Sequence, residues 1–222
     1  MMSAIFLLVA LLLILSSTQS FSIADLVGEK LFSVQRSSSS VSDFENVVWK
    51  DAYELAMGGL YFDKSSLQSP FDRLPLDAKA SVPEGVWNQS IKSAGIHVEF
   101  VTNSVEIYIN YNLSLSSTQA WNMDAGGYSS VDLYAFDVVT NMYRWITTWE
   151  LVNYPNNTGL LASGIGFKAE KGTLFRLNFP LSNRVSTLSI GVSTVTSTTN
   201  GTGPLIFDKP ALLVSEGPNS LI

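Results

Sequence analysis

The sequence predicts an all-β fold, a two-sheet β-sandwich of the jelly-roll type. Apolar and polar residues alternate with a period of two in several segments after residue 46. These segments are short, and turn-forming stretches such as "VTNM" and "PLSN" separate them. No segment after residue 46 carries a long apolar pattern with a period of 3.6, so no long helix is expected there.

The first 24 residues are typical of a secretion signal. The apolar run from Ala4 to Leu15 is shorter than the roughly 20 residues that span a bilayer, and small residues follow it. No Lys or Arg precedes the run, so an N-terminal membrane anchor is the alternative. The Ser-rich, polar residues 25–45 predict a linker. We therefore expect a secreted chain with one folded domain over residues 46–214 and a tail over residues 215–222.

Four sequons agree with export and predict N-glycosylation at Asn88, Asn112, Asn156 and Asn200. Asn112 falls on the polar side of its predicted strand, where a glycan can be accommodated. The chain has no cysteine, so its stability depends on core packing without disulfides.

The strands can be placed by their alternation. Residues 96–101 and 105–112 each predict a half-buried strand, and the short "TNS" between them predicts a hairpin. Pro70, Pro75 and Pro83 exclude a long helix within residues 68–85. Turns are expected at "YPNNTG" and "TSTTNGTG". Further strands are predicted at residues 131–139, 143–149, 173–179, 187–194 and 205–214.

Charge and composition exclude several function classes. The net charge of −6 and the scattered Lys and Arg residues argue against nucleic acid and against an anionic membrane as partner. His97 is the sole histidine, and by alternation it points to solvent, away from the buried side of its strand. A Ser-His-Asp triad therefore finds no support. Asp124, Asp132 and Asp137 match no calcium-loop spacing, so we predict no metal site and no cofactor.

Five stretches, in order, carry a likeness to a known family. They are "SPFDRLP", "VWNQSIKSAGIHVEFVTNSVEIYINYNL", "NMDAGGYSSVDLYAFD" with "YRWITTW", "LFRLNFPLSNRVSTLSIGV" and "DKPALLV". Residues 46–214 thereby resemble the N-terminal domain of SGNH hydrolase-type esterases, which is named for a Gly-x-Asp-Leu-Tyr motif. The resemblance implies a galactose-binding-like jelly roll. In family members, an α/β domain with a Ser nucleophile follows and acts on carboxyl esters, often acyl groups on carbohydrate.

The chain departs from the family pattern at two places. Ser130 stands where the motif has Gly, which matters if that position needs a positive φ; Gly126 and Gly127 are then the alternative turn residues. After Lys209-Pro210, the family's nucleophile turn does not follow. We therefore expect no catalytic residue here, and an accessory domain that binds carbohydrate or other cell-surface material. The alternatives are an incomplete product of a full esterase and a structural extracellular domain without ligand.

The residues that draw attention belong to two sets. In "YRWITTW", alternation places Tyr143, Trp145 and Trp149 on one face, as a platform for sugar stacking or as part of the core. Trp87 and Trp121 are expected to be structural. The second set comprises Arg73, Asp132, Leu133 and Tyr134 of the motif stretches, and we expect it to be structural. Arg73 is expected to pair with Asp132 or Asp72. Leu133 and Tyr134 are expected to lie on opposite sides of their strand.

Overall fold

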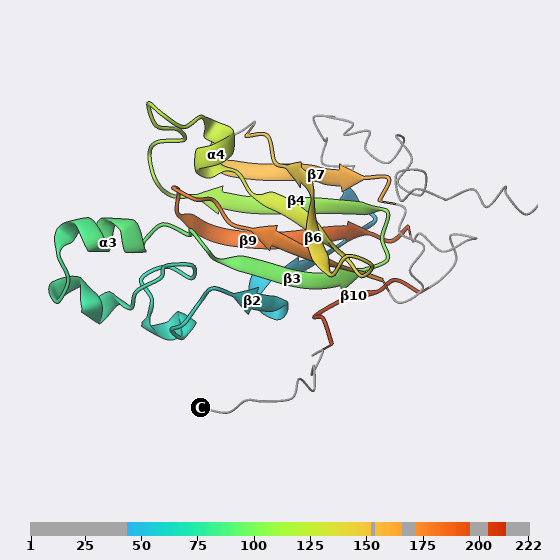
Figure 1. Cartoon of the computed structure of the whole chain (residues 1–222), viewed down its shortest axis with the longest axis horizontal. Coiled ribbons are helices and arrows are strands. Elements are labelled where there is room, and N and C mark those ends of the chain that lie inside the picture. The colour runs from blue at the N-terminus through green and yellow to red at the C-terminus, as the bar shows by residue number, and fades with distance from the viewer. Residues whose placement is uncertain (1–43, 152–153, 166–171, 196–203, 212–222) are drawn as a thin grey trace, which may run out of the picture. The chain divides into compact units, whose positions relative to one another are not determined.

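A computed structural model describes residues 44–151, 154–165, 172–195 and 204–211, and these form two antiparallel β-sheets (Figure 1). All of them fall in one compact unit, residues 33–222. The predicted signal, nearly all of the predicted linker, the tail and the sequon at Asn200 lie outside the described residues.

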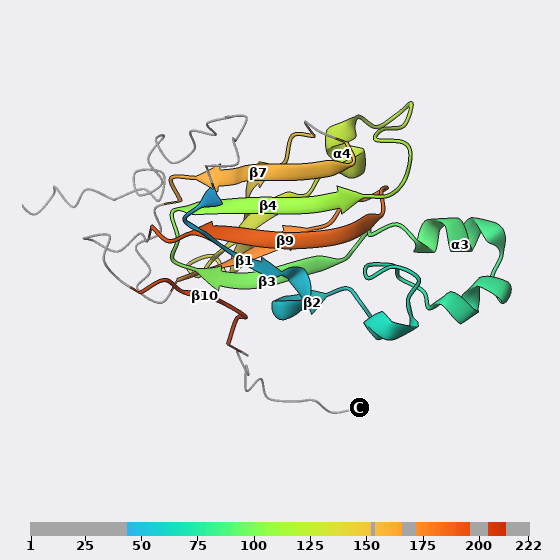
Figure 2. The same cartoon turned by 180° about the vertical axis from the view of Figure 1, so that it is seen from behind.

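The first sheet has four strands, and Figure 2 shows them side by side. Their order is β1 (Val47–Asp51), β9 (Val185–Ser193), β4 (Glu106–Leu113) and β7 (Asn156–Ser163). The alternation in β4 buries Ile107, Ile109 and Tyr111 completely.

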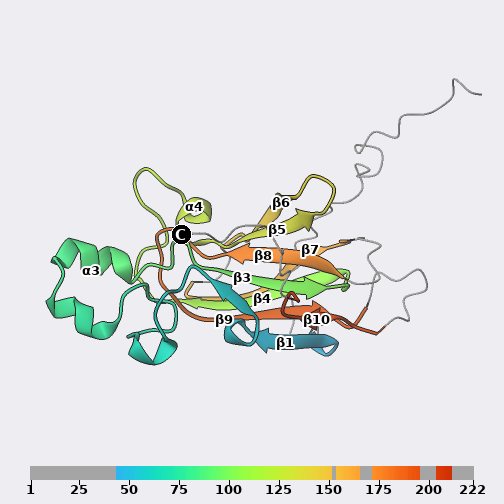
Figure 3. The ribbon, with the colours of Figure 1, turned by 60° about the horizontal axis from the view of Figure 1, so that its bottom comes forward.

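The second sheet has six strands. Their order is β10 (Phe207–Asp208), β3 (His97–Thr102), β8 (Thr173–Asn178), β5 (Asp132–Asp137) and β6 (Met142–Thr148), and β2 (Ala56–Gly58) pairs with β3 as well. Figure 3 shows β5, β8 and β3 in one layer and β4, β9 and β1 in the other. A continuous apolar core lies between the layers, with side chains from both.

The two-sheet β-sandwich is thus confirmed, and five of the predicted strands are present as β3, β4, β5, β6 and β8. The strand predicted at residues 187–194 is also present, as part of β9. The hairpin between residues 96–101 and 105–112 is wrong, because β3 and β4 belong to different sheets. Alternation reveals which side of a strand is buried but not which strand lies beside it.

The corner between β3 and β4 is buried and polar. Asn103 donates to the carbonyl of Pro204 at 3.0 Å and accepts from the amide of Ile206 at 2.8 Å. The Ser104 hydroxyl donates to the carbonyl of Ser193 at 2.8 Å. These bonds satisfy the buried side chains and hold the chain where it passes from one sheet to the other.

Three further differences from the sequence prediction concern β7, β10 and the pair of short strands β1 and β2. The predicted turn "YPNNTG" ends early, since β7 already begins at Asn156. Asn157 and Gly159 are the buried residues in its first half, so no apolar alternation signals the start of the strand. The strand predicted at 205–214 is reduced to Phe207–Asp208 in the described part. The short β1 and β2 were not predicted.

Helices are short, as the sequence predicts. The described residues hold α3 (Glu84–Ser90) and α4 (Ala125–Ser129), with 3₁₀ turns at Ala52–Glu54, Lys64–Ser66 and Leu76–Ala80. Among the described residues, no helix has the length and apolarity needed to cross a membrane.

A buried ion pair ties one end of the sandwich together. Asp72 is fully buried and accepts from Nε of Arg184 at 2.7 Å and from its Nη2 at 2.5 Å. It also caps the turn before it by accepting from the amide of Ser69 at 3.1 Å. Arg184 directly precedes β9, so the pair joins the "SPFDRLP" segment to the four-stranded sheet.

Replacing Asp72 with Ala should lower the free energy of unfolding by about 3–5 kcal/mol, because the guanidinium of Arg184 is left unpaired at a largely buried site. Urea unfolding measures this. The double variant Asp72→Leu with Arg184→Met should recover part of the loss, since no charge is then stranded. A loss below about 1 kcal/mol for Asp72→Ala would show that the pair is not needed.

Candidate functional site

The outer side of the six-stranded sheet gathers the motif's polar residues. We call this surface the motif face; it is formed by His97, Glu99, Asp132, Tyr134, Tyr143, Trp145, Thr148, Arg176 and Asn178. The strand register arranges all of them except Tyr143 in two rows. One row is His97, Asn178, Asp132 and Thr148, and the other is Glu99, Arg176, Tyr134 and Trp145.

An irregularity in β6 shapes this face. Tyr134 pairs with Trp145, but Leu133 pairs with Thr147, so Ile146 is an extra residue in the strand. Such a bulge re-aims the side chains that follow it. Both Ile146 and Thr147 are buried, while Thr148 comes to lie opposite Asp132.

The bulge corrects the predicted aromatic platform of Tyr143, Trp145 and Trp149. Tyr143 and Trp145 do lie on the outer side of β6. Trp149 follows the bulge, packs against the core and donates from Nε1 to Asn157 at 3.3 Å. The shared face of all three is therefore wrong, and so is a core position for Trp145, whose exposed fraction is 59%.

Asp132 makes a short chain of hydrogen bonds on the motif face. Its Oδ1 accepts from the hydroxyl of Thr148 at 2.5 Å. The oxygen of that hydroxyl accepts from Nε1 of Trp145 at 3.2 Å. The carboxylate on β5 is thereby linked to the exposed indole on β6.

Tyr143 is held by a second carboxylate. Its hydroxyl donates to Glu99 at 2.6 Å, and Arg176 donates to the same oxygen from Nε at 2.9 Å and from Nη2 at 2.6 Å. The guanidinium carbon of Arg176 also lies 4.0 Å from the centroid of the Tyr143 ring. Three strands, β3, β6 and β8, are joined by this cluster.

The cluster shifts two pKa values. Burial, followed by the hydrogen bond to Glu99, raises the pKa of Tyr143 to about 12. Burial also works to raise the pKa of Glu99, but hydrogen bonds from Tyr143 and Arg176 and the charge of Arg176 outweigh it, so the pKa lies below its ordinary value. Glu99 is therefore held as a carboxylate.

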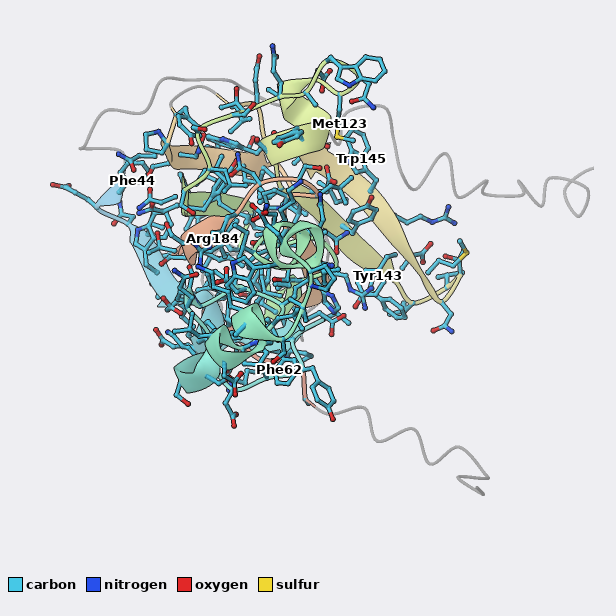
Figure 4. The ribbon with its side chains drawn as sticks, turned by 90° about the vertical axis from the view of Figure 1, so that its left-hand side faces the viewer. Phe44, Phe62, Met123, Tyr143, Trp145 and Arg184 are labelled. Atoms are coloured by element: carbon cyan, nitrogen blue, oxygen red, sulfur yellow. The ribbon has the colours of Figure 1, made fainter. Side chains whose placement is uncertain are left out.

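The opposite side of the sandwich is different in character. Phe44, Trp49 and Tyr108 form edge and tilted ring contacts with one another over the four-stranded sheet. Trp49 covers Gly191, where a Cβ would come within 3.0 Å of the indole ring. These rings therefore pack against one another and against the sheet. Figure 4 shows Phe44 on one side and Tyr143 and Trp145 on the other.

Arg73 contacts neither Asp132 nor Asp72, so both predicted pairings are wrong. Its Nη2 donates to the carbonyl of Gln89 at 2.5 Å and its Nε to that of Lys92 at 3.1 Å, which places it against the end of α3. The charged partner of Asp72 is Arg184, which the sequence did not single out.

The remaining motif predictions have clear outcomes. Leu133 is fully buried and Tyr134 lies on the outer side, as predicted. Ser130 has φ −89°, so the motif's Gly position needs no positive φ in this chain. Asp132 is a hydrogen-bonding residue at the sheet surface, as expected.

Two other tryptophans were predicted to be structural. Trp87 is buried in α3, and this prediction is confirmed. Trp121 is 97% exposed in the loop before α4, so the prediction is wrong for this residue.

Three sequons lie in the described part. Asn88 is exposed on α3, and Asn156 is exposed at the start of β7. Asn112 is half-buried on the outer side of β4 and pairs directly with Asn156 across the strands. These last two lie on the side of the sandwich opposite the motif face.

The predicted orientation of His97 is confirmed. It is partly exposed on the motif face, while Ile96, Val98 and Phe100 are buried. Its imidazole occupies the space above Gly58, where a Cβ would clash with it.

The acidic residues serve separate local contacts. Asp124 caps α4 through the amide of Gly127, and Asp137 accepts from the hydroxyl of Thr140. Within the described residues, no group of three His, Asp or Glu side chains could hold a metal ion.

Sequence reasoning missed Glu99, Arg176 and Asn178 as site residues. A signal for the last two was present, because they alternate with Phe175 and Leu177 in "LFRLNF" and must therefore face outward. Thr148 had no such signal, because simple alternation from Trp145 places it on the inner side.

Fold and site together define a β-sandwich domain with an aromatic and polar outer sheet face. The chain belongs to the family GxDLY, the N-terminus of Esterase_SGNH_hydro-type, whose model matches residues 47–197.

Two solved structures share similarity with the chain. One is a GDSL-like lipase from Bacteroides ovatus ATCC 8483, with a TM-score of 0.59 and 20% identity over 75% of this chain and 44% of that one. The other is the salicylyl-acyltransferase SsfX3 from a tetracycline biosynthetic pathway, with a TM-score of 0.37 and 11% identity over 75% of this chain and 40% of that one. The chain thus spans less than half the length of either protein. No curated protein matches it.

Replacing Glu99 with Gln should lower the free energy of unfolding by about 1 kcal/mol at neutral pH, since the charge-assisted contacts are partly exposed. The pKa of Glu99 is lowered in the folded state, so its contribution is present above the unfolded value of about 4.3 and is lost as the pH falls through the folded value. Urea unfolding of both proteins between about pH 7 and pH 3 should show the difference shrinking on acidification. A difference that grows on acidification would contradict this assignment.

Proposed function

We propose that this domain is a non-catalytic accessory module of the SGNH-type esterase family that binds carbohydrate on the motif face. The observation that carries the proposal is the 59% exposed Trp145 beside polar side chains on the outer side of the six-stranded sheet. Apolar ring faces stack on sugars, while neighbouring hydroxyl, amide and carboxylate groups select their orientation. Asn178 supplies such a group in the adjoining row, beside Asp132.

The surroundings of His97 support a non-catalytic role. It is the single histidine of the chain, and a Ser-His-Asp mechanism needs a histidine hydrogen-bonded to the nucleophile. The cross-strand neighbours of His97 are Gly58 and Asn178, which are not nucleophiles. Ester hydrolysis by this chain alone is therefore not expected, and purified protein should not hydrolyse p-nitrophenyl acetate above the buffer rate.

An alternative is that the domain belongs to the product of a full carboxyl-ester hydrolase. The 44% coverage of the GDSL-like lipase favours this reading, because more than half of that protein has no counterpart here. The module would then hold an esterified carbohydrate near a catalytic domain. Sequencing the transcript beyond codon 210 tests it: an open frame with a Ser-containing turn and a distal Asp-x-x-His would favour the esterase. The remaining alternative, a structural extracellular domain, predicts no ligand at all.

The proposal includes secretion, N-glycosylation and a galactose-binding-like jelly roll. The exposed positions of Asn88 and Asn156 support glycosylation in a eukaryotic host. Glycans at Asn112 or Asn156 would cover the side of the four-stranded sheet and leave the motif face open. Expression in a secretory host followed by peptide N-glycosidase treatment should give a fall in apparent mass, and an unchanged mass would contradict this part.

The binding proposal is tested on an array of neutral and O-acetylated oligosaccharides. The wild-type protein should bind a subset. Trp145→Ala should weaken that binding at least about five-fold, because removing an aromatic ring on which a ligand stacks costs roughly 1–3 kcal/mol.

Trp121→Ala is the matched control, since Trp121 is also exposed but lies in the loop before α4, outside the strands that form the motif face. It should bind as the wild type does. Binding to no glycan, or equal losses in both variants, would contradict a carbohydrate site on the motif face.

A further inference from the structure

We propose that Asp132 and Thr148 are positioning residues that fix the indole of Trp145 for stacking. The motif aspartate would thus act on a ligand through another side chain rather than by touching it. This inference rests on the proposed carbohydrate-binding function. The position of Asp132 in the family motif and its half-buried environment do not by themselves indicate this role.

Hydrogen-bond chemistry sets the direction of the chain. A carboxylate only accepts, so the single hydroxyl proton of Thr148 is directed to Asp132. The lone pairs of the Thr148 oxygen then remain for the indole N–H of Trp145, which only donates. Each member has one possible role, so the indole edge has a defined partner at the sheet surface.

The bulge at Ile146 makes this chain possible. If the ladder continued past Trp145 without a bulge, Ile146 would pair with Leu133, Thr147 would lie opposite Asp132 and Thr148 would turn toward the core. With it, Thr148 faces outward beside Trp145 and closes the link between β5 and β6. A feature that breaks the regular ladder is thus used to bring a hydroxyl between a carboxylate and an indole.

The half-buried ring of Tyr143, also on the outer side of β6, is held in a comparable way. Tyr143 donates its hydroxyl to Glu99 on β3, and Arg176 lies over its face. The hydroxyl of Tyr143 is thus bonded directly to a carboxylate on β3, whereas the indole of Trp145 is linked to the carboxylate of Asp132 on β5 through Thr148 of its own strand. An aromatic side chain that is already ordered loses less conformational freedom when a ligand stacks on it.

The test uses nuclear magnetic resonance of ¹⁵N-tryptophan-labelled protein, in which each of the five indoles gives one signal. Trp145→Ala assigns the signal of interest. Thr148→Val should shift that signal and speed hydrogen exchange at the indole nitrogen, whereas Thr148→Ser should retain the wild-type values. Thr187→Val, the same change on the exposed side of β9, is the matched control and should leave the Trp145 signal in place.

Binding measurements complete the test. Against an oligosaccharide selected on the array, Thr148→Val and Asp132→Ala should each weaken binding about three- to ten-fold, as expected for one lost hydrogen bond. Their combination should weaken it no further than either alone, because both act through Trp145. Thr148→Ser should bind as the wild type does.

The outcomes separate this inference from the proposed function. If Thr148→Val binds as tightly as wild type and leaves the Trp145 signal unmoved, positioning is overturned while carbohydrate binding stands. A shifted Trp145 signal with no glycan bound by any protein overturns the proposed function and leaves the link intact as a property of the fold. Additive losses in the double variant would show that Asp132 touches the ligand itself and would overturn positioning.

Discussion

The arrangement of the motif face depends on one extra residue in an edge strand. Ile146 interrupts the pairing of β5 with β6. Before Ile146 the odd-numbered residues of β6 face outward, and after it the even-numbered residue Thr148 does. Trp145 lies on the outer side of the sheet, and Trp149 packs against the core. The hydroxyl of Thr148 donates to Asp132. A bulge costs regular ladder hydrogen bonds, and here the burial of Ile146 and the contacts of Thr148 offset that cost.

The two sides of the sandwich use aromatic residues differently. Over the four-stranded sheet, Phe44, Trp49 and Tyr108 pack on one another and above Gly191. Over the six-stranded sheet, the Tyr143 hydroxyl bonds Glu99 on β3, and the Trp145 indole bonds Thr148, which in turn bonds Asp132 on β5. The first arrangement stabilises the fold, whereas the second keeps ring surface exposed at a defined place. This contrast is why the motif face, and not the other side, is the candidate ligand surface.

The fold could be predicted from the sequence more fully than the site could. Alternation in β3 and β4 revealed their buried sides, because Val98, Phe100 and Ile109 fill the core whichever strands lie beside them. It could not reveal that the chain changes sheets at Asn103 and Ser104, since that depends on distant partners such as Ser193 and Pro204. β7 was not predicted because Asn157 and Gly159 occupy the buried positions in its first half.

At the site, Tyr143 and Trp145 were found by alternation, and Trp149 was misplaced because a bulge leaves no mark in a single sequence. Arg73 was paired with a carboxylate on chemical grounds, but backbone carbonyls at the end of α3 satisfy it instead. Asp72 finds Arg184, which follows it by 112 positions in the chain. Charge complementarity indicates that a buried carboxylate needs a partner, and tertiary structure decides which one.

The central claim is that ligand binds on the outer side of β5, β6 and β8. Chemical-shift mapping of backbone amides during titration with an acetylated oligosaccharide tests this most directly. The account predicts perturbations concentrated on these three strands, strongest around Trp145 and Thr148, with β1, β4 and β9 unaffected. Perturbations centred on the four-stranded sheet, or none at millimolar ligand, would contradict it.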